Sequence, residues 1–220
     1  DPEIVDFSTG SVGLAGPAAL FGALTRDYLE THSLEPTSGR FYAHLGDAEM
    51  DEGSMWEAVI EPVLNGIDRC TWVVDVNRQS LDRVVPGIRV RQFMDMLTAN
   101  GWTVLTAKYG DRLTELMHRP GGEALRRRID DMSNEEYQGL LVSDHGELKG
   151  RLLNGAGKGR SDLQRCVGDV DDDELYERIT NLGGHDVGYL SRLLKKATDT
   201  PGSTAVFAYT VKGWGLHSAA

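Results

Sequence analysis

RFYAHLGDAEMDE, residues 40–52, combines a short apolar and aromatic run, Arg40–Gly46, with an acidic segment directly after it. Such a run predicts a buried β-strand with polar groups at its carboxyl end. The next run of this kind is TWVVDV, Thr71–Val76, and it is followed by Asn77, 30 residues after Asp47. One strand–helix–strand unit fits between Asp47 and Asn77, so we expect two parallel strands.

The rest of the chain extends this pattern. Two further strands are predicted at Thr103–Lys108 and Thr204–Val211. Amphipathic stretches predict helices over Ala15–Thr31, Ser54–Leu64, Arg89–Asn100, Leu113–Met117, Glu123–Asp131, Asn134–Leu141 and Val187–Thr198, the last with Asp186 as its N-cap. The predicted fold is therefore α/β, with a parallel sheet covered by helices on both faces in three layers. We expect residues 1–220 to form a single domain. Residues 143–168, which are rich in glycine and poor in apolar anchors, are expected to form a surface excursion.

Composition excludes several classes of protein. The chain has 34 acidic and 23 basic residues, a formal net charge of -11, which argues against a nucleic-acid surface. The basic run Arg126–Arg128 has acidic residues on both sides, which is typical of a solvated helix face. Cys70 and Cys166 form no CxxC pair, so a reducing cytoplasm is the expected location. No apolar stretch reaches the roughly 18 residues of a membrane span.

The residues after the first two strands carry the chemistry. If the strands are neighbours, the Asp47 carboxylate and the Asn77 carboxamide meet at one edge of the sheet, where ligands of α/β proteins bind. Oxygen donors of this kind suit magnesium, which commonly completes its shell with ligand phosphates and water. Gly46 allows close backbone approach, and the helix start at Gly53-Ser54 favours a diphosphate. Either segment alone is more often an ordinary turn, but together the two make a metal site about as probable as a turn.

Five motifs carry a resemblance to a known family. Gly46-Asp47 and Asn77 resemble the two ends of the thiamine-diphosphate motif. More specifically, the homodimeric decarboxylating component of pyruvate dehydrogenase complexes is similar to this chain in five blocks: FSTGSVGL (Phe7–Leu14), GDAEMDE (Gly46–Glu52), VNRQSLD (Val76–Asp82), NLGGHD (Asn181–Asp186) and YTVKGWG (Tyr209–Gly215). The blocks follow the family's order and spread over nearly the whole chain.

The resemblance implies roles for individual residues. Asp47, the Asn77 side chain and the Gln79 backbone carbonyl match the magnesium ligands. The other matched positions contact the cofactor diphosphate (Gly46, Ala48 and Glu49), pack against the cofactor (Val12 and Leu81) or reach the substrate adduct (Lys212). Two residues depart from the family pattern: Ala48 replaces the second glycine of the motif, and Val12 stands where a larger apolar residue is expected. From the sequence alone, Lys212 is more often explained as an ordinary strand-end lysine than as a catalytic one.

The implied activity is oxidative decarboxylation of pyruvate, or of another 2-oxo acid, by thiamine diphosphate. The acetyl unit would pass to a lipoyl group on an acyltransferase subunit, and the full-length protein would be a homodimer. The activating glutamate lies in a second domain of the family that has no match here, so we expect this chain to be a fragment that is inactive alone. The alternatives are a transketolase-type carboligase and a non-catalytic diphosphate-binding module. A phosphate loop at Gly155–Gly159 is rejected, because its residues and the lack of a preceding strand do not fit.

Overall fold

The computed structural model describes residues 5–34, 39–77, 79–80, 83–84 and 87–214. The chain forms two compact units, where the sequence predicts one domain. The first unit comprises Asp1–Ala107 and Leu190–Tyr209, and the second comprises Lys108–Tyr189 and Thr210–Ala220.

A four-stranded parallel sheet forms the centre of the first unit. Its order is β1-β2-β6-β5, with bounds Phe41–Gly46, Cys70–Val76, Thr204–Tyr209 and Thr103–Ala107. All three pairings are parallel. The four predicted strands are confirmed, with each boundary within two residues of the prediction.

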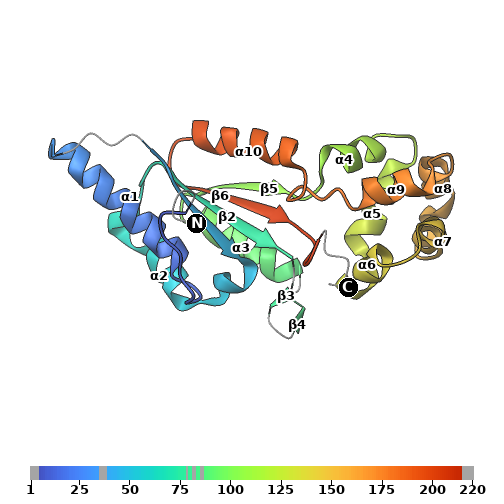
Figure 1. Ribbon diagram of the computed structural model, residues 1–220, viewed down its shortest axis with the longest axis horizontal. Helices are drawn as coiled ribbons and strands as arrows, with labels where there is room; N and C mark the ends of the chain where they lie inside the picture. Colours follow the sequence, from blue (N-terminus) through green and yellow to red (C-terminus); the bar gives the residue numbers. More distant parts are fainter. Residues whose placement is uncertain (1–4, 35–38, 78, 81–82, 85–86, 215–220) are drawn as a thin grey trace. The chain divides into compact units, whose positions relative to one another are not determined.

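Helices cover both faces of this sheet. Figure 1 shows α1 (Ala15–Thr31), α2 (Gly53–Ile60) and α3 (Gly87–Ala99) on one face and α10 (Val187–Asp199) on the other. The central strand β6 is buried on both sides: Ala205 and Phe207 join the core under α1–α3, and Val206 packs on the α10 side. The three-layer α/β fold is therefore confirmed.

Trp72, which is fully buried in β2, fixes how closely α1 approaches the sheet. Its indole N–H donates to the carbonyl of Gly16 in α1 at 3.2 Å, and its ring packs against Trp102 at 4.5 Å between centroids. A Cβ at Gly16 would lie 2.8 Å from the Trp72 ring. A larger residue at Gly16 would therefore push the helix off the strand.

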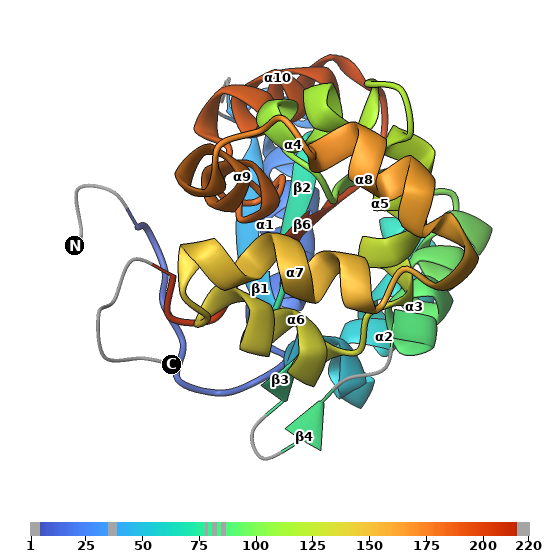
Figure 2. The ribbon, with the colours of Figure 1, turned by 90° about the vertical axis from the view of Figure 1, so that its right-hand side faces the viewer.

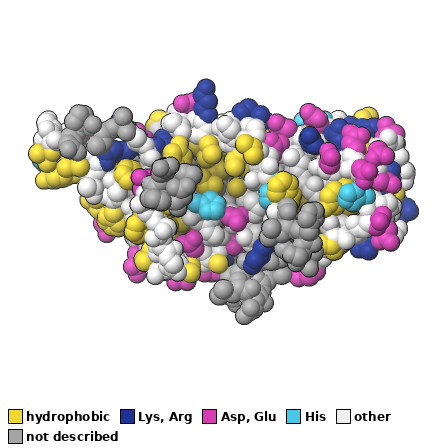
Figure 3. Space-filling model, in the orientation of Figure 1, with side chains coloured by type: hydrophobic (Ala, Val, Ile, Leu, Met, Phe, Trp, Pro, Cys, Tyr) yellow, Lys and Arg dark blue, Asp and Glu magenta, His cyan; other side chains and the backbone are white. Residues whose placement is uncertain are grey.

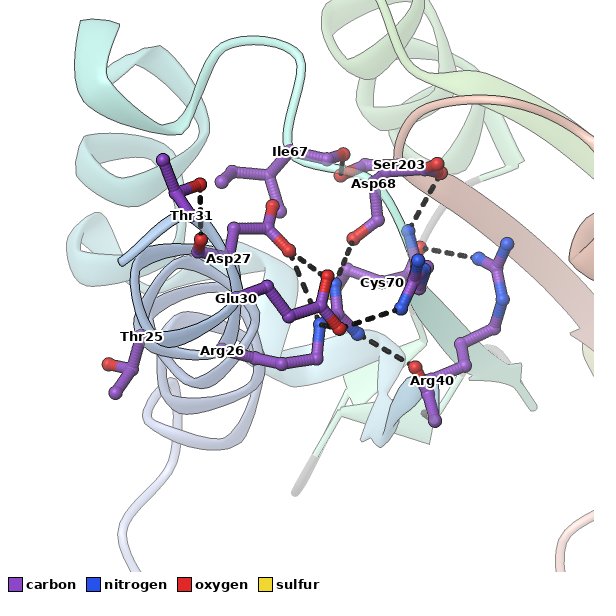
Figure 4. A network of polar contacts seen from close by, with 12 residues as sticks. Thr25, Arg26, Asp27, Glu30, Thr31, Arg40, Ile67, Asp68, Cys70 and Ser203 are labelled. Atoms are coloured by element: carbon purple, nitrogen blue, oxygen red, sulfur yellow. Dashed lines mark hydrogen bonds and ion pairs between the residues drawn. The ribbon is translucent and has the colours of Figure 1, made fainter. Parts of the chain in front are cut away.

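A polar network surrounds the amino-terminal ends of β1 and β2, as Figure 4 shows. The guanidinium of Arg26, a side chain only 5% exposed, donates to the Gly39 carbonyl at 2.7 Å, the Asp68 carbonyl at 3.2 Å and the Asp27 carboxylate at 2.7 Å. Arg69 pairs with Glu30 at 3.1 Å. α1 is thus tied to the segments that lead into β1 and β2.

The structure differs from the sequence prediction on both sides of β2. The helix predicted over Ser54–Leu64 ends at Ile60, and a 3-10 turn, η2 (Pro62–Leu64), follows. Proline disfavours the helical conformation in the residue before it, which explains the break. A small antiparallel hairpin, β3 (Gln79–Ser80) with β4 (Arg83–Val84), follows β2 and was not predicted.

The second unit is helical. Figure 2 faces its helices: α4 (Asp111–Met117), α5 (Gly122–Asp131), α6 (Asn134–Leu141), α7 (His145–Asn154), α8 (Arg160–Val167) and α9 (Asp172–Ile179). They enclose a core of their own, separate from that of the sheet. Among the described residues, no helix is long and apolar enough to span a membrane.

The expectation of a surface excursion over residues 143–168 is wrong. This segment forms α7, a 3-10 turn η3 (Gly157–Gly159) and α8, and it contributes the fully buried Leu148, Leu152 and Leu163 to the second core. Its glycines misled the prediction because several of them mark helix ends. Gly155 and Gly168 are C-caps, and Gly159 is an N-cap.

We predict that Leu163→Ala lowers the free energy of unfolding by about 2–5 kcal/mol, because it leaves a cavity in the second core. Val142→Ala is the control, since Val142 is 61% exposed, and surface changes usually stay within about 0.5 kcal/mol. Urea unfolding followed by circular dichroism measures both. Equal effects of the two substitutions would contradict the assignment of this segment to the core.

Candidate functional site

The carboxyl ends of β1 and β2 form one corner of the sheet. The two strands pair in parallel with Gly46 opposite Asp75, so the residues that leave them, Asp47 and Asn77, start from adjacent strand ends. The prediction that Asp47 and Asn77 follow neighbouring parallel strands is therefore confirmed. Their role as metal ligands stays a prediction.

Asp47 begins a 3-10 helix, η1 (Asp47–Asp51), that packs under the corner. Its side chain is among the few buried charged groups of the described residues, with only 3% of the residue exposed. η1 lies against β1, β2 and β3. This arrangement brings the backbone of Gln79, in β3, to the segment that starts with Asp47, as a shared metal site would require.

Asn77 is oriented by a neighbour on its own strand. Its side-chain nitrogen donates to Asp75 Oδ2 at 3.3 Å. The amide nitrogen therefore faces Asp75, and the amide oxygen is the atom that a magnesium ion would take.

The other two acids of η1 have partners inside the first unit. Glu49 accepts the backbone N–H of Gly46 at 3.0 Å and that of Gly13 at 3.1 Å. Asp51 accepts Nε of Arg89 at 3.1 Å and a second bond from the same guanidinium. Glu49 was expected at the cofactor diphosphate, but its carboxylate is occupied by backbone amides. Nothing in the sequence near Glu49 indicated the long-range bond to Gly13.

The backbone of two glycines at this corner has open space beside it that a ligand could occupy. A Cβ built on Gly46 would meet no described atom within 4 Å, and the same holds for Gly53, where α2 begins. Within the described part of the chain, no group of three or more His, Cys, Asp or Glu side chains could hold a metal by itself. A carboxylate, a carboxamide and a backbone carbonyl beside open space are a donor set that fits magnesium completed by phosphate and water.

Of the three remaining residues expected at the cofactor, the structure describes two, Val12 and Ala48. Val12 precedes the tightly held Gly13 and is 55% exposed, so it is available to cover a ligand. Ala48 is half-buried in η1. Leu81 lies outside the described residues.

Lys212 lies in the second unit, on an exposed turn that His185 holds. The backbone N–H of Val211 donates to Nε2 of His185 at 2.8 Å, and the His185 ring stacks on Trp214 at 4.5 Å. Asp186, beside it, caps α10 by accepting the N–H of Tyr189 at 2.9 Å, as predicted. The NLGGHD and YTVKGWG motifs are thus in direct contact, which their separation in the sequence did not reveal.

Arg126–Arg128 does not form a basic patch. Arg126 pairs with Glu123 at 3.9 Å, and the buried Arg128 pairs with Glu136. On the face of the second unit seen in Figure 3, basic side chains alternate with acidic ones. The interpretation of this run as a solvated helix face fits the exposed Arg127 and is wrong for Arg128, which is buried in α5.

Comparison with known proteins gives a consistent result. The chain is similar to the pyruvate dehydrogenase E1 component of Escherichia coli K12, with 30% identity over 223 residues that cover 100% of this chain and 24% of the relative. The protein of the same name from Corynebacterium glutamicum is 29% identical over 96% of the chain, and that of Mycobacterium tuberculosis 27% identical over 98%; the chain covers 23% of each. No family model matches the chain. The resemblance inferred from the motifs is confirmed along the whole chain, which spans about a quarter of the length of these relatives.

The reactivity of Cys70 tests whether the start of β2 is buried from solvent. It is fully buried at the start of β2, and burial raises the pKa of its thiol to about 12, against the opposing effect of Arg40 and Arg26. Burial also raises the pKa of the Cys166 thiol. We predict that neither thiol reacts with a disulfide reagent at pH 8 in the folded protein, and that both react at once in urea, because only the exposed thiolate is a nucleophile. Rapid labelling of the folded protein would contradict this burial.

Proposed function

We propose that this chain, which aligns in full with a quarter of a pyruvate dehydrogenase E1 component, anchors thiamine diphosphate through magnesium in an enzyme that decarboxylates pyruvate. One observation carries the proposal: the parallel pairing of β1 with β2 sets Asp47 and Asn77 at adjacent strand ends. This corner is where ligands of open α/β sheets bind. The family resemblance supplies the identity of the ligand.

In this proposal three groups hold the magnesium ion: the Asp47 carboxylate, the Asn77 amide oxygen and the backbone carbonyl of Gln79. Gly46, Ala48 and the start of α2 receive the diphosphate with backbone groups. Val12 and Leu81 cover the cofactor with apolar side chains. Thiamine diphosphate, when bound, supplies the nucleophilic carbon and the electron sink that decarboxylation of a 2-oxo acid needs.

Lys212 is proposed to contact the substrate adduct with its ammonium group. The support is its match to the family motif and the way its turn is held, since Val211 and Trp214 on either side are both fixed by His185. A lysine on a fixed turn loses less conformational freedom when it binds an anionic group.

The whole enzyme is proposed to oxidise pyruvate and to pass the acetyl unit to a lipoyl group on an acyltransferase subunit, as a cytoplasmic homodimer. The glutamate that activates the cofactor would come from another part of the protein. We therefore propose that this chain alone is inactive with pyruvate, thiamine diphosphate and magnesium.

We predict a graded loss of cofactor binding in three variants of the full-length protein. Asp47→Ala should abolish magnesium-dependent binding of thiamine diphosphate, because it removes the only charged ligand that the protein gives to the ion in this proposal. Asn77→Ala should weaken binding less, since water can replace a neutral donor, and Gln79→Ala should have little effect because its backbone makes the contact. Calorimetric titration at fixed magnesium measures the order. If Gln79→Ala is as damaging as Asp47→Ala, the coordination is wrong.

We also predict that the full-length protein releases carbon dioxide from pyruvate and acetylates a lipoyl domain. The reaction should require both thiamine diphosphate and magnesium. Ketol transfer between sugar phosphates is the control reaction and should be absent. If the protein transfers ketol units, or binds the cofactor without turnover of any 2-oxo acid, the proposed activity is wrong.

A further inference from the structure

The carboxylate of Glu49 joins two segments that lie 33 residues apart in the sequence, Gly13 and Gly46. Oε1 accepts the N–H of Gly46 at 3.0 Å and Oε2 accepts the N–H of Gly13 at 3.1 Å. The first bond is local and closes the start of η1, as a glutamate three residues after a helix N-cap often does. The second bond reaches 36 residues back and has no such local explanation.

The loop that Glu49 reaches is held at both sides of one residue. The N–H that binds Glu49 belongs to the peptide between Val12 and Gly13, and the carbonyl of Gly13 accepts the hydroxyl of Ser54 at 2.7 Å. Gly13 has φ +81°, and a Cβ there would lie 2.5 Å from the Cβ of Glu52. Only glycine fits this loop while it lies against the start of α2.

We propose that Glu49 is a positioning residue, whose carboxylate sets the Val12–Gly13 peptide against the end of β1 so that Val12 covers the cofactor beside Asp47. This inference rests on the proposed function, because Val12 has a ligand to cover only if thiamine diphosphate binds at this corner. In this proposal the Glu49 carboxylate acts on the loop and not on the diphosphate, because it already accepts two backbone N–H groups. Its negative charge is stabilised by two backbone N–H groups, which make strong hydrogen bonds to an ionised acceptor.

Glu49→Gln tests the proposal with almost no change of shape. Glutamine has one acceptor oxygen where glutamate has two, so one of the two backbone N–H groups would face an NH₂ group instead. Glu52→Gln is the matched control. It removes one negative charge from the same corner, and within the described residues the Glu52 carboxylate has no hydrogen bond or ion pair.

The first measurement is amide hydrogen exchange of the full-length protein without cofactor. In Glu49→Gln, exchange at the Gly13 amide should rise by roughly tenfold, as expected for loss of one charge-assisted bond. Glu52→Gln should leave it unchanged. This readout does not depend on the proposed function. Unchanged exchange at Gly13 in a folded Glu49→Gln variant would overturn the proposal.

The second measurement compares two ligands by calorimetry with magnesium present: thiamine diphosphate and inorganic diphosphate. Glu49→Gln should lower the affinity for thiamine diphosphate by roughly three- to tenfold. The affinity for inorganic diphosphate should not change, because only the larger ligand contacts Val12 in this proposal. Loss of both affinities to the same extent would indicate a merely structural role and overturn the proposal. If Glu49→Gln and Glu52→Gln both strengthen the binding of thiamine diphosphate to the same extent, the proposal is also overturned. The main effect of Glu49 would then be repulsion between its charge and the diphosphate.

Two further outcomes are kept distinct. If the unmodified protein binds neither ligand, the proposed function fails, while exchange at Gly13 still decides whether Glu49 holds the loop. If Glu49→Gln fails to fold, Glu49→Asp replaces it, because the shorter side chain keeps the charge but cannot reach the Gly46 and Gly13 amides together. Glu49→Asp should again weaken the binding of thiamine diphosphate and leave the binding of inorganic diphosphate unchanged, and unchanged binding of both ligands would overturn the proposal.

Discussion

The parallel pairing of β1 with β2 is the constraint on which the candidate site depends. Its register sets Gly46 opposite Asp75, and a slip of one residue would turn every side chain of the strand to the other face. The register is secured on the core side, where Ala43 and Leu45 of β1 and Trp72 and Val74 of β2 are buried together. The burial pattern that folds the sheet therefore also places the two polar residues that leave it.

The two ends of this sheet are built differently. At the amino-terminal end, Arg26 and its partners bind backbone carbonyls and fix the entry of β1 and β2 (Figure 4). Removing these partners would leave the charge of the buried Arg26 side chain uncompensated, which is costly. At the carboxyl end, η1 and α2 present the open backbone of Gly46 and Gly53. Side-chain hydrogen bonds thus tie the end that the proposed ligand does not use, while the other end presents open backbone.

The sequence predicted the fold well because the four strands are short apolar runs, each bounded by polar residues. It failed at residues 143–168, where Leu148 and Leu152 have helical spacing but the glycines at helix ends hid the pattern. The placement of Asp47 and Asn77 at adjacent strand ends could be predicted because each directly follows a strand. The long-range contacts of Glu49 with Gly13 and of His185 with Val211 could not, since a single sequence carries no sign of which distant backbone amide a side chain meets. Such contacts depend on the packing of whole elements.

The acidic corner raises the question of how a diphosphate could bind there. Two unit charges 4 Å apart interact by roughly 4 kcal/mol at the polarity of a protein surface, so uncompensated acids would repel the ligand. The structure reduces this repulsion in two places, because Arg89 pairs with Asp51 and backbone amides surround the Glu49 carboxylate. Glu52 keeps its charge in the same corner, and Asp47 is the acid that directly follows the end of β1. A divalent cation beside Asp47 would reverse the sign of its interaction with a diphosphate. On this argument the cation is what makes the corner a diphosphate site, and the acids that have partners, Glu49 and Asp51, serve to shape it.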